Sequence, residues 1–202
     1  YVCGYVCVLS DRIGTRDQTL LMNNERLAIP ELLFRPQDRL SAMELHPDDA
    51  HELGRLFEGD YQVRVTELDG WLTLGAHLPP KEKRGIVLVD PPFEKEGEYE
   101  RLVDGLAKAH RRFANGVYCL WYPIKKGAPI KEFHEALQAL DIPKMLCAEL
   151  HVKSDRDQTG LSGTGLIIVN PPFTLKADLH TILPTLKDVL AQDRYASQRA
   201  FW

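Results

Sequence analysis

Long apolar stretches, a positive net charge and low-complexity segments are all missing from this sequence of 202 residues. No apolar run reaches the roughly 18 residues that a membrane-spanning helix needs, so the sequence predicts no such helix. The net charge of −4 argues against a protein that binds polyanions through its overall charge. The sequence contains no internal repeats and no low-complexity linker.

Cysteines are few, and their spacing is not that of a metal site. The four are Cys3, Cys7, Cys119 and Cys147. Cys119 and Cys147 lie in apolar runs typical of strands, which indicates buried thiols in a reducing cytoplasm. Residues 1–9 are apolar but lack a basic leader and a small-residue cleavage site, so we do not expect a signal peptide. We therefore predict a cytoplasmic protein without a metal.

The sequence has enough apolar residues, 44%, for one globular domain with a proper core. Strand-like and helix-like patterns alternate along it, which predicts βαβ units and a parallel sheet. The polar stretch 154–162 joins the last two strands, and we expect this pair to form an antiparallel edge. The predicted strands are 40–45, 61–66, 86–89, 117–122, 145–152 and 165–169, and the predicted helices are 46–57, 98–114, 130–140 and 176–192.

The most informative segment is Asp90-Pro91-Pro92-Phe93, which directly follows the apolar run at 85–89. A base amino group is a poor nucleophile because its lone pair is delocalised into the ring. The Asp90 carboxylate and the Pro91 carbonyl can each accept one of its N–H groups, and Phe93 can stack on an extruded base. Two prolines stiffen the loop. The alternative is a strand that ends in a rigid loop with a solvated aspartate.

A second copy of this pattern, Asn170-Pro171-Pro172-Phe173, follows another apolar run. Either copy suits amino-group methylation, because an amide can also accept the N–H. We favour Asp90, since a carboxylate is the stronger acceptor. The second copy lies near the C-terminus, where an edge or return strand is expected.

Acidic residues also follow the two preceding predicted strands. Glu44 can accept both hydroxyls of a ribose, and Asp69 can accept from an adenine amino group while Gly70 allows close approach. Ligands lie at the carboxyl ends of parallel strands. The alternatives are a helix-capping acid for Glu44 and a plain turn for Asp69-Gly70. Together with Asp90, the set favours a cofactor that contains adenosine.

Three local clusters of cations stand out against the negative net charge. Each is either a solvated face or a place where RNA phosphates are bound. The clusters are Lys81, Lys83 and Arg84; Lys108, His110, Arg111 and Arg112; and Lys125, Lys126 and Lys131.

From about Leu32 to about Ala191 the sequence resembles the RlmJ type of 23S rRNA adenine N6-methyltransferase. The matching motifs are Met43-Glu44-Leu45-His46-Pro47, Asp69-Gly70, the run from Arg84 to Glu94, Tyr118-Cys119-Leu120-Trp121-Tyr122-Pro123 and Asn170-Pro171-Pro172-Phe173. The resemblance implies a Rossmann-type, S-adenosylmethionine-dependent enzyme that methylates a flipped-out or single-stranded adenine in 23S rRNA. A cytoplasmic monomer without a membrane segment is expected.

The resemblance also implies roles for individual residues. Glu44 would hold the cofactor ribose, and Asp69 with Gly70 would line its adenine. Asp90 would contact both cofactor and target amino group as the catalytic residue. Phe93 stands where the family usually has tyrosine, which preserves stacking but loses a hydroxyl hydrogen bond.

The N-terminal part departs from the family. We divide the chain into an unmatched segment, 1–31, and a partial Rossmann-like methyltransferase domain, 32–202. Residues 3–9 have a strand-like pattern, but Ser10 to Gly14 contains a single glycine rather than the glycine-rich cofactor loop. Two alternatives stay open: a non-catalytic nucleic-acid-binding protein with a role in DNA uptake or utilisation, and an amino-methyltransferase for DNA adenine or protein glutamine.

Overall fold

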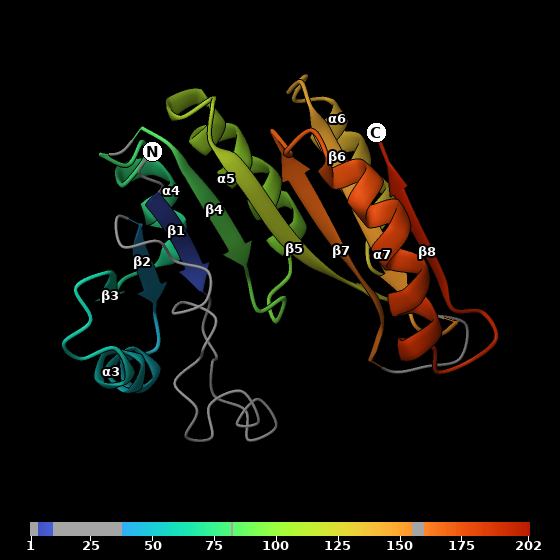
Figure 1. Cartoon of the computed structure of the whole chain (residues 1–202), viewed down its shortest axis with the longest axis horizontal. Helices are drawn as coiled ribbons and strands as arrows, with labels where there is room; N and C mark the ends of the chain where they lie inside the picture. The colour runs from blue at the N-terminus through green and yellow to red at the C-terminus, as the bar shows by residue number, and fades with distance from the viewer. Residues whose placement is uncertain (1–3, 10–37, 82, 155–159) are drawn as a thin grey trace. The chain divides into compact units, whose positions relative to one another are not determined.

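The structure, a computed structural model, describes residues 4–9, 38–81, 83–154 and 160–202 (Figure 1). The chain forms two compact units. The first comprises the described part of residues 1–92 together with 108–116, and the second comprises the described part of 93–107 and 117–202. Helix α5 (Glu98–Arg112) contributes its first turns to the second unit and its last turn to the first.

Four parallel strands form the sheet of the first unit, in the order β3-β2-β1-β4. They are β1 (Gly4–Leu9), β2 (Arg39–Glu44), β3 (Val63–Glu67) and β4 (Gly85–Asp90). The register pairs Leu9 of β1 with Asp90 of β4, and Glu44 of β2 with Glu67 of β3. The ends of the strands therefore lie level with one another along one edge.

Strand β1 occupies the position between β2 and β4. The strand-like pattern at the start of the sequence is therefore confirmed as a strand. The chain continues from β1 to strands on one side of it and then to β4 on the other, which creates a switch point beside β1. Residues 10–37, the predicted absence of a glycine-rich loop and the predicted boundary after residue 31 fall outside the described residues.

Two short helices pack against the sheet of this unit. Helix α3 (Pro47–Leu56) begins with proline and two acidic residues, as the sequence predicts, and packs against β2 and β3. Helix α4 (Gly70–Ala76) packs against β1 and β2. It was not predicted, because seven residues are too few to show an amphipathic period.

Antiparallel strands form the sheet of the second unit, in the order β5-β7-β6-β8. They are β5 (Val117–Lys125), β6 (Met145–His151), β7 (Leu161–Val169) and β8 (Ser197–Phe201). The predicted antiparallel pairing of β6 with β7 is confirmed. Strand β8 pairs with β6 and was not predicted.

Helices α6 (Ile130–Gln138) and α7 (Leu175–Leu190) cover opposite faces of this sheet (Figure 1). Alternate residues of β6 show the division. Leu146 and Ala148 pack with Leu183 of α7, whereas Cys147 and Glu149 contact His134 of α6. Among the residues that the structure describes, no helix is both long and apolar enough to span a membrane.

Candidate active site

Acidic residues gather at the carboxyl edge of the first unit's sheet. Glu44 ends β2, Asp69 follows β3 and Asp90 ends β4. Only β1 separates β2 from β4, and neighbouring strands are about 4.8 Å apart, so the backbones at Glu44 and Asp90 are roughly 10 Å apart. The three predicted acids therefore share one edge of the sheet, at the switch point where ligands bind in open α/β folds.

Asp90 is exposed to solvent, although neighbouring atoms cover part of its carboxyl group. Burial by surrounding atoms raises the pKa of its carboxyl above the usual value, while part of the residue stays in contact with solvent. Pro91, the next residue, is buried. A ligand at the end of β4 can therefore reach the Asp90 carboxylate.

Glu44 is fully buried at the end of β2. Its Oε1 accepts a hydrogen bond from the backbone N–H of His46 at 2.9 Å. His46 is the N-cap residue of α3. The carboxylate thus fixes the turn from β2 into α3, which agrees with the capping alternative and holds an acceptor at the sheet edge.

Asp69 is the N-cap residue of α4, and its Oδ1 accepts the backbone N–H of Trp71 at 2.9 Å. Gly70 is the first residue of the helix and is buried. The plain turn that the sequence left open is therefore a helix start. The predicted contacts of Asp69 and Gly70 with an adenine ring stay predictions.

Phe93 belongs to the second unit and is 9% exposed. Its ring centroid lies 4.8 Å from that of Tyr99 and 5.9 Å from that of Trp121. Its backbone has φ of 53°, the left-handed region that a bulky residue rarely adopts. Little of the ring is left to meet a base, so the predicted stacking of Phe93 stays a prediction.

Within the second unit, Phe93 of the first copy and the residue before Asn170 of the second copy contact opposite ends of β5. The carbonyl of Phe93 accepts a hydrogen bond from Lys125 Nζ, at the end of β5. Val169, which precedes Asn170, pairs with Tyr118 at the start of β5. The Phe173 side chain is 99% exposed. The choice of Asp90 over Asn170 as the catalytic residue stays a prediction.

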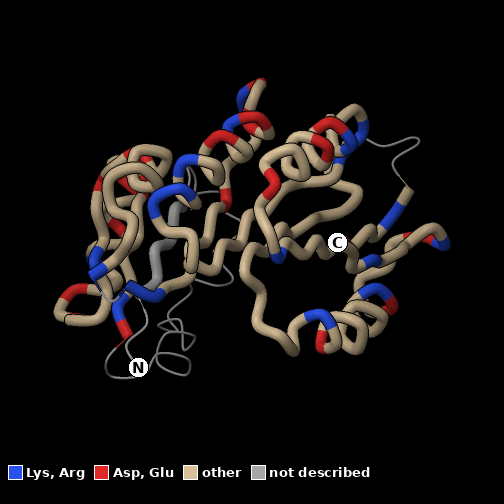
Figure 2. Tube along the Cα trace, turned by 90° about the horizontal axis from the view of Figure 1, so that it is seen from above, with Lys and Arg blue, Asp and Glu red and all other residues tan. Residues whose placement is uncertain are grey.

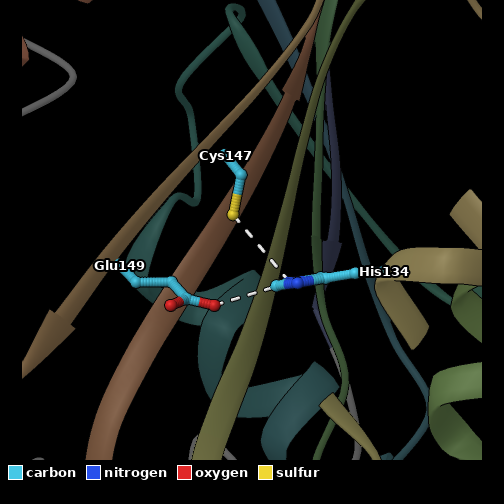
Figure 3. A group of neighbouring side chains, drawn as sticks. All are labelled: His134, Cys147 and Glu149. Atoms are coloured by element: carbon cyan, nitrogen blue, oxygen red, sulfur yellow. Dashed lines mark hydrogen bonds and ion pairs between the residues drawn. The ribbon is translucent and has the colours of Figure 1, made fainter. Parts of the chain in front are cut away.

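A polar cluster that the sequence did not reveal lies under α6 in the second unit. His134, Cys147 and Glu149 each offer a ligand atom within 4.8 Å of the others (Figure 3). The hydroxyl of Tyr122 lies among them, 2.7 Å from Glu149 Oε1, 3.0 Å from His134 Nε2 and 3.3 Å from Cys147 Sγ. Arg199 Nε donates to the other oxygen of Glu149.

Hydrogen bonds already engage the ligand atoms of this cluster. Burial raises the pKa of the Cys147 thiol to about 12, which opposes the thiolate that a metal needs. Burial also raises the pKa of Glu149, but hydrogen bonds from His151, Arg199 and Tyr122 outweigh it and lower the pKa to about 2. We interpret the cluster as a structural network around an ionised glutamate.

Two of the predicted basic clusters adjoin one another in the first unit. Arg112 Nε donates to the carbonyl of Leu78 at 3.1 Å, and the Asn115 amide donates to the carbonyl of Lys83 at 3.4 Å. These bonds bring the loop before β4 against the end of α5. Figure 2 shows the Lys and Arg positions along the chain. We define the basic patch as Lys81, Lys83, Arg84, Lys108, Arg111 and Arg112, all exposed.

The parallel sheet with acidic strand ends and the antiparallel C-terminal strands define a Rossmann-like methyltransferase fold. A crystal structure of a Legionella pneumophila protein matches 98% of this chain and 88% of that one, with a TM-score of 0.80 and 27% identity. A probable spermidine synthase from Corynebacterium glutamicum matches 98% of this chain and 66% of that one, with a TM-score of 0.57 and 13% identity. The second likeness concerns the fold alone.

The family described as "Ribosomal RNA large subunit methyltransferase D, RlmJ" matches residues 18–202, and the chain belongs to this family. Ribosomal RNA large subunit methyltransferase J of Escherichia coli is 41% identical over 162 residues, 80% of this chain and 58% of that protein. Its namesake in Haemophilus influenzae is 39% identical over 170 residues, 84% of this chain and 60% of that protein. The matched part thus spans about 60% of these relatives.

Proposed function

We propose that the chain catalyses methyl transfer from S-adenosylmethionine to the N6 amino group of an adenine in 23S rRNA, in the cytoplasm. The observation that carries the proposal is the place of Asp90-Pro91-Pro92-Phe93 in a chain of the RlmJ family. The motif begins at the carboxyl end of β4, next to the end of β1, where an open α/β sheet binds its ligands.

The proposed chemistry relies on acceptors rather than on a strong base. The Asp90 carboxylate accepts one N–H of the adenine amino group, and the Pro91 carbonyl accepts the other. Both bonds localise the nitrogen lone pair and direct it along the line of attack. Bound S-adenosylmethionine supplies an electrophilic methyl group on a sulfonium sulfur. The amino nitrogen loses one proton, and in this proposal Asp90 receives it and passes it to solvent.

The described residues suit an adenosine-containing cofactor. Glu44 and Asp69 hold their carboxylates at the ends of neighbouring parallel strands through bonds to His46 and Trp71. Carboxylate acceptors match the hydroxyls of a ribose and the amino group of an adenine. We propose that Glu44 holds the ribose and that Asp69 with Gly70 lines the adenine.

Asp90→Ala and Asp90→Asn test the catalytic role. We expect Asp90→Ala to abolish transfer of labelled methyl groups to 23S rRNA and Asp90→Asn to retain a small fraction, because an amide still accepts one N–H. Formation of N6-methyladenosine is measured by mass spectrometry of digested rRNA. Asn170→Ala is the matched control in the second copy of the motif and should leave the rate unchanged.

A binding measurement distinguishes a variant that has lost catalysis from one that has lost the cofactor site. Titration with S-adenosylmethionine should show saturable binding that Glu44→Ala weakens and Asp90→Asn largely keeps. Full methylation by Asp90→Ala would contradict the proposal. Salt-sensitive RNA binding without any cofactor effect would instead favour a non-catalytic binding protein.

A further inference from the structure

Phe93 is held at three points by residues of the second unit. Its ring packs against Tyr99 and Trp121. Lys125 Nζ donates to its carbonyl at 3.4 Å. The backbone N–H of Phe93 donates a hydrogen bond to the carboxylate of Glu98, which also accepts one from the N–H of Glu94. Contacts on the ring, the carbonyl and the N–H together keep a phenylalanine at a φ of 53°.

Glu98 occupies an unfavourable environment for a carboxylate. It is the first residue of α5 and is 3% exposed. Its Oε2 has no hydrogen-bond partner among the described residues. Burial raises the pKa of Glu98, and the backbone N–H groups only partly offset this effect. A buried carboxylate with an unpaired oxygen costs stability, and such a cost is typical of residues that serve a functional site.

The hydrogen bond from the Phe93 N–H to Glu98 restricts the conformation of the loop that precedes Phe93. An N–H and the carbonyl of the preceding residue lie in one rigid peptide plane. When Glu98 fixes the Phe93 N–H, it therefore fixes the plane that contains the Pro92 carbonyl. Because φ of each proline is already restricted, few rotations are left between this plane and the Pro91 carbonyl.

From this geometry we infer that Glu98 is a positioning residue for methyl transfer, because it holds the left-handed turn at Phe93 and with it the direction of the diproline carbonyls. The inference rests on the proposed function. Without Glu98, Phe93 can relax to negative φ, and the peptide planes before it turn. A small misplacement of an acceptor is enough to lower the rate of a reaction that depends on alignment.

Glu98→Gln and Glu98→Ala test the inference, with Glu100→Gln as the matched control on the exposed side of the same helix. We expect kcat for 23S rRNA methylation to fall roughly 10-fold in Glu98→Gln and roughly 100-fold in Glu98→Ala. KM for S-adenosylmethionine should stay unchanged in both. The control should match the wild type in every measurement.

Thermal unfolding distinguishes positioning from a structural role. Glu98→Gln keeps an acceptor oxygen and removes a buried charge, so its Tm should equal or exceed that of the wild type while its kcat falls. Amide hydrogen exchange at Phe93 should speed up in Glu98→Ala and stay slow in the control. A parallel fall of Tm and kcat in both variants would overturn the inference, as would wild-type kcat in folded Glu98→Ala.

The experiment also separates this inference from the proposed function. A wild-type chain that binds S-adenosylmethionine but does not methylate 23S rRNA would contradict the proposed function, and the positioning role with it. A methylating wild type whose Glu98 variants have an unchanged kcat would contradict the inference alone.

Discussion

Glu149 shows how one buried charge can be made tolerable by its neighbours. Its carboxylate is fully buried, and it receives hydrogen bonds from Tyr122 on one oxygen and Arg199 on the other. The side chains of His134 and His151 each lie 3.4 Å from it. Polar side chains from β5, β6, β8 and α6 therefore meet at this one carboxylate.

Removal of Glu149 should be costly because the fully buried hydroxyl of Tyr122 would lose its acceptor. We expect Glu149→Ala to lower the free energy of unfolding by about 1–3 kcal/mol, the cost of leaving a buried polar group without its partner, because the Arg199 side chain reaches solvent. Urea unfolding followed by circular dichroism measures the change. Glu135→Ala on the exposed side of α6 is the control, because the pair of Glu135 with Lys131 lies at the surface and should contribute less than about 1 kcal/mol.

The same carboxylate predicts how stability depends on pH. The pKa of Glu149 is lowered to about 2 in the folded protein, from an ordinary value of 4.5. Its stabilising contribution is therefore fully present above pH 4.5 and is lost as the pH falls towards about 2. Urea unfolding at a series of pH values should show this loss. Glu149→Gln should show a smaller change over this pH range, and an equal change would contradict the assignment.

At the scale of strands and helices, the pattern of apolar and polar residues predicted most of the fold. The apolar run before Asp90 forms β4, and the segment 98–114, which has apolar residues at helical spacing, contains α5. Each of these segments has a period long enough to identify its type. The shared position of the acidic residues at one edge of the first unit's sheet could also be predicted, because residues directly after parallel strands lie at the same edge.

The elements and contacts that were missed depend on tertiary structure. Strand β8 is short and carries polar residues, and it is ordered against β6, where Arg199 meets Glu149. The bond from Phe93 to Glu98 likewise has no sequence signature, since any glutamate near the start of a helix looks like a favourable charge. Burial, which gives both glutamates their importance, cannot be read from one sequence.

The lack of a side chain at Gly165 of β7 leaves room for the ring of Tyr122, which lies on the neighbouring strand β5. A Cβ atom at Gly165 would overlap the ring and hydroxyl of Tyr122. We therefore expect Gly165→Ala to destabilise the protein by about 1–3 kcal/mol, because the ring must leave its network. Gly54→Ala is the control: nothing lies within 4 Å of the added carbon in α3, so stability should rise by about 0.5–1 kcal/mol.

At the scale of the whole molecule, the net charge of −4 means that the proposed rRNA substrate would have to be bound through local charge. The basic patch brings together cations from two separate stretches of the sequence. Each phosphate contact that is lost should lower the slope of log affinity against log salt by roughly 0.7–0.9. The patch is therefore the part of the described surface that we expect to set the salt dependence of RNA binding.

Charge reversal tests this expectation. Lys83→Glu combined with Arg111→Glu should weaken binding to 23S rRNA fragments and reduce the salt slope, with little change in S-adenosylmethionine binding. Lys176→Glu combined with Lys187→Glu on α7 changes the net charge by the same amount and is the control. Equal weakening by both pairs would show that overall charge, rather than the patch, governs binding. Filter binding at several salt concentrations gives the slopes.

The pairing of Leu9 with Asp90 makes the proposed reaction centre sensitive to chain length as well as to residue type. Side chains of a strand alternate between its two faces, so a shift of one position turns every one of them over. Deletion of a single residue such as Val87 would leave the four-residue motif intact and still direct its carboxylate to the wrong side of the sheet. Insertions and deletions in β4 should therefore be as damaging as the loss of the aspartate itself.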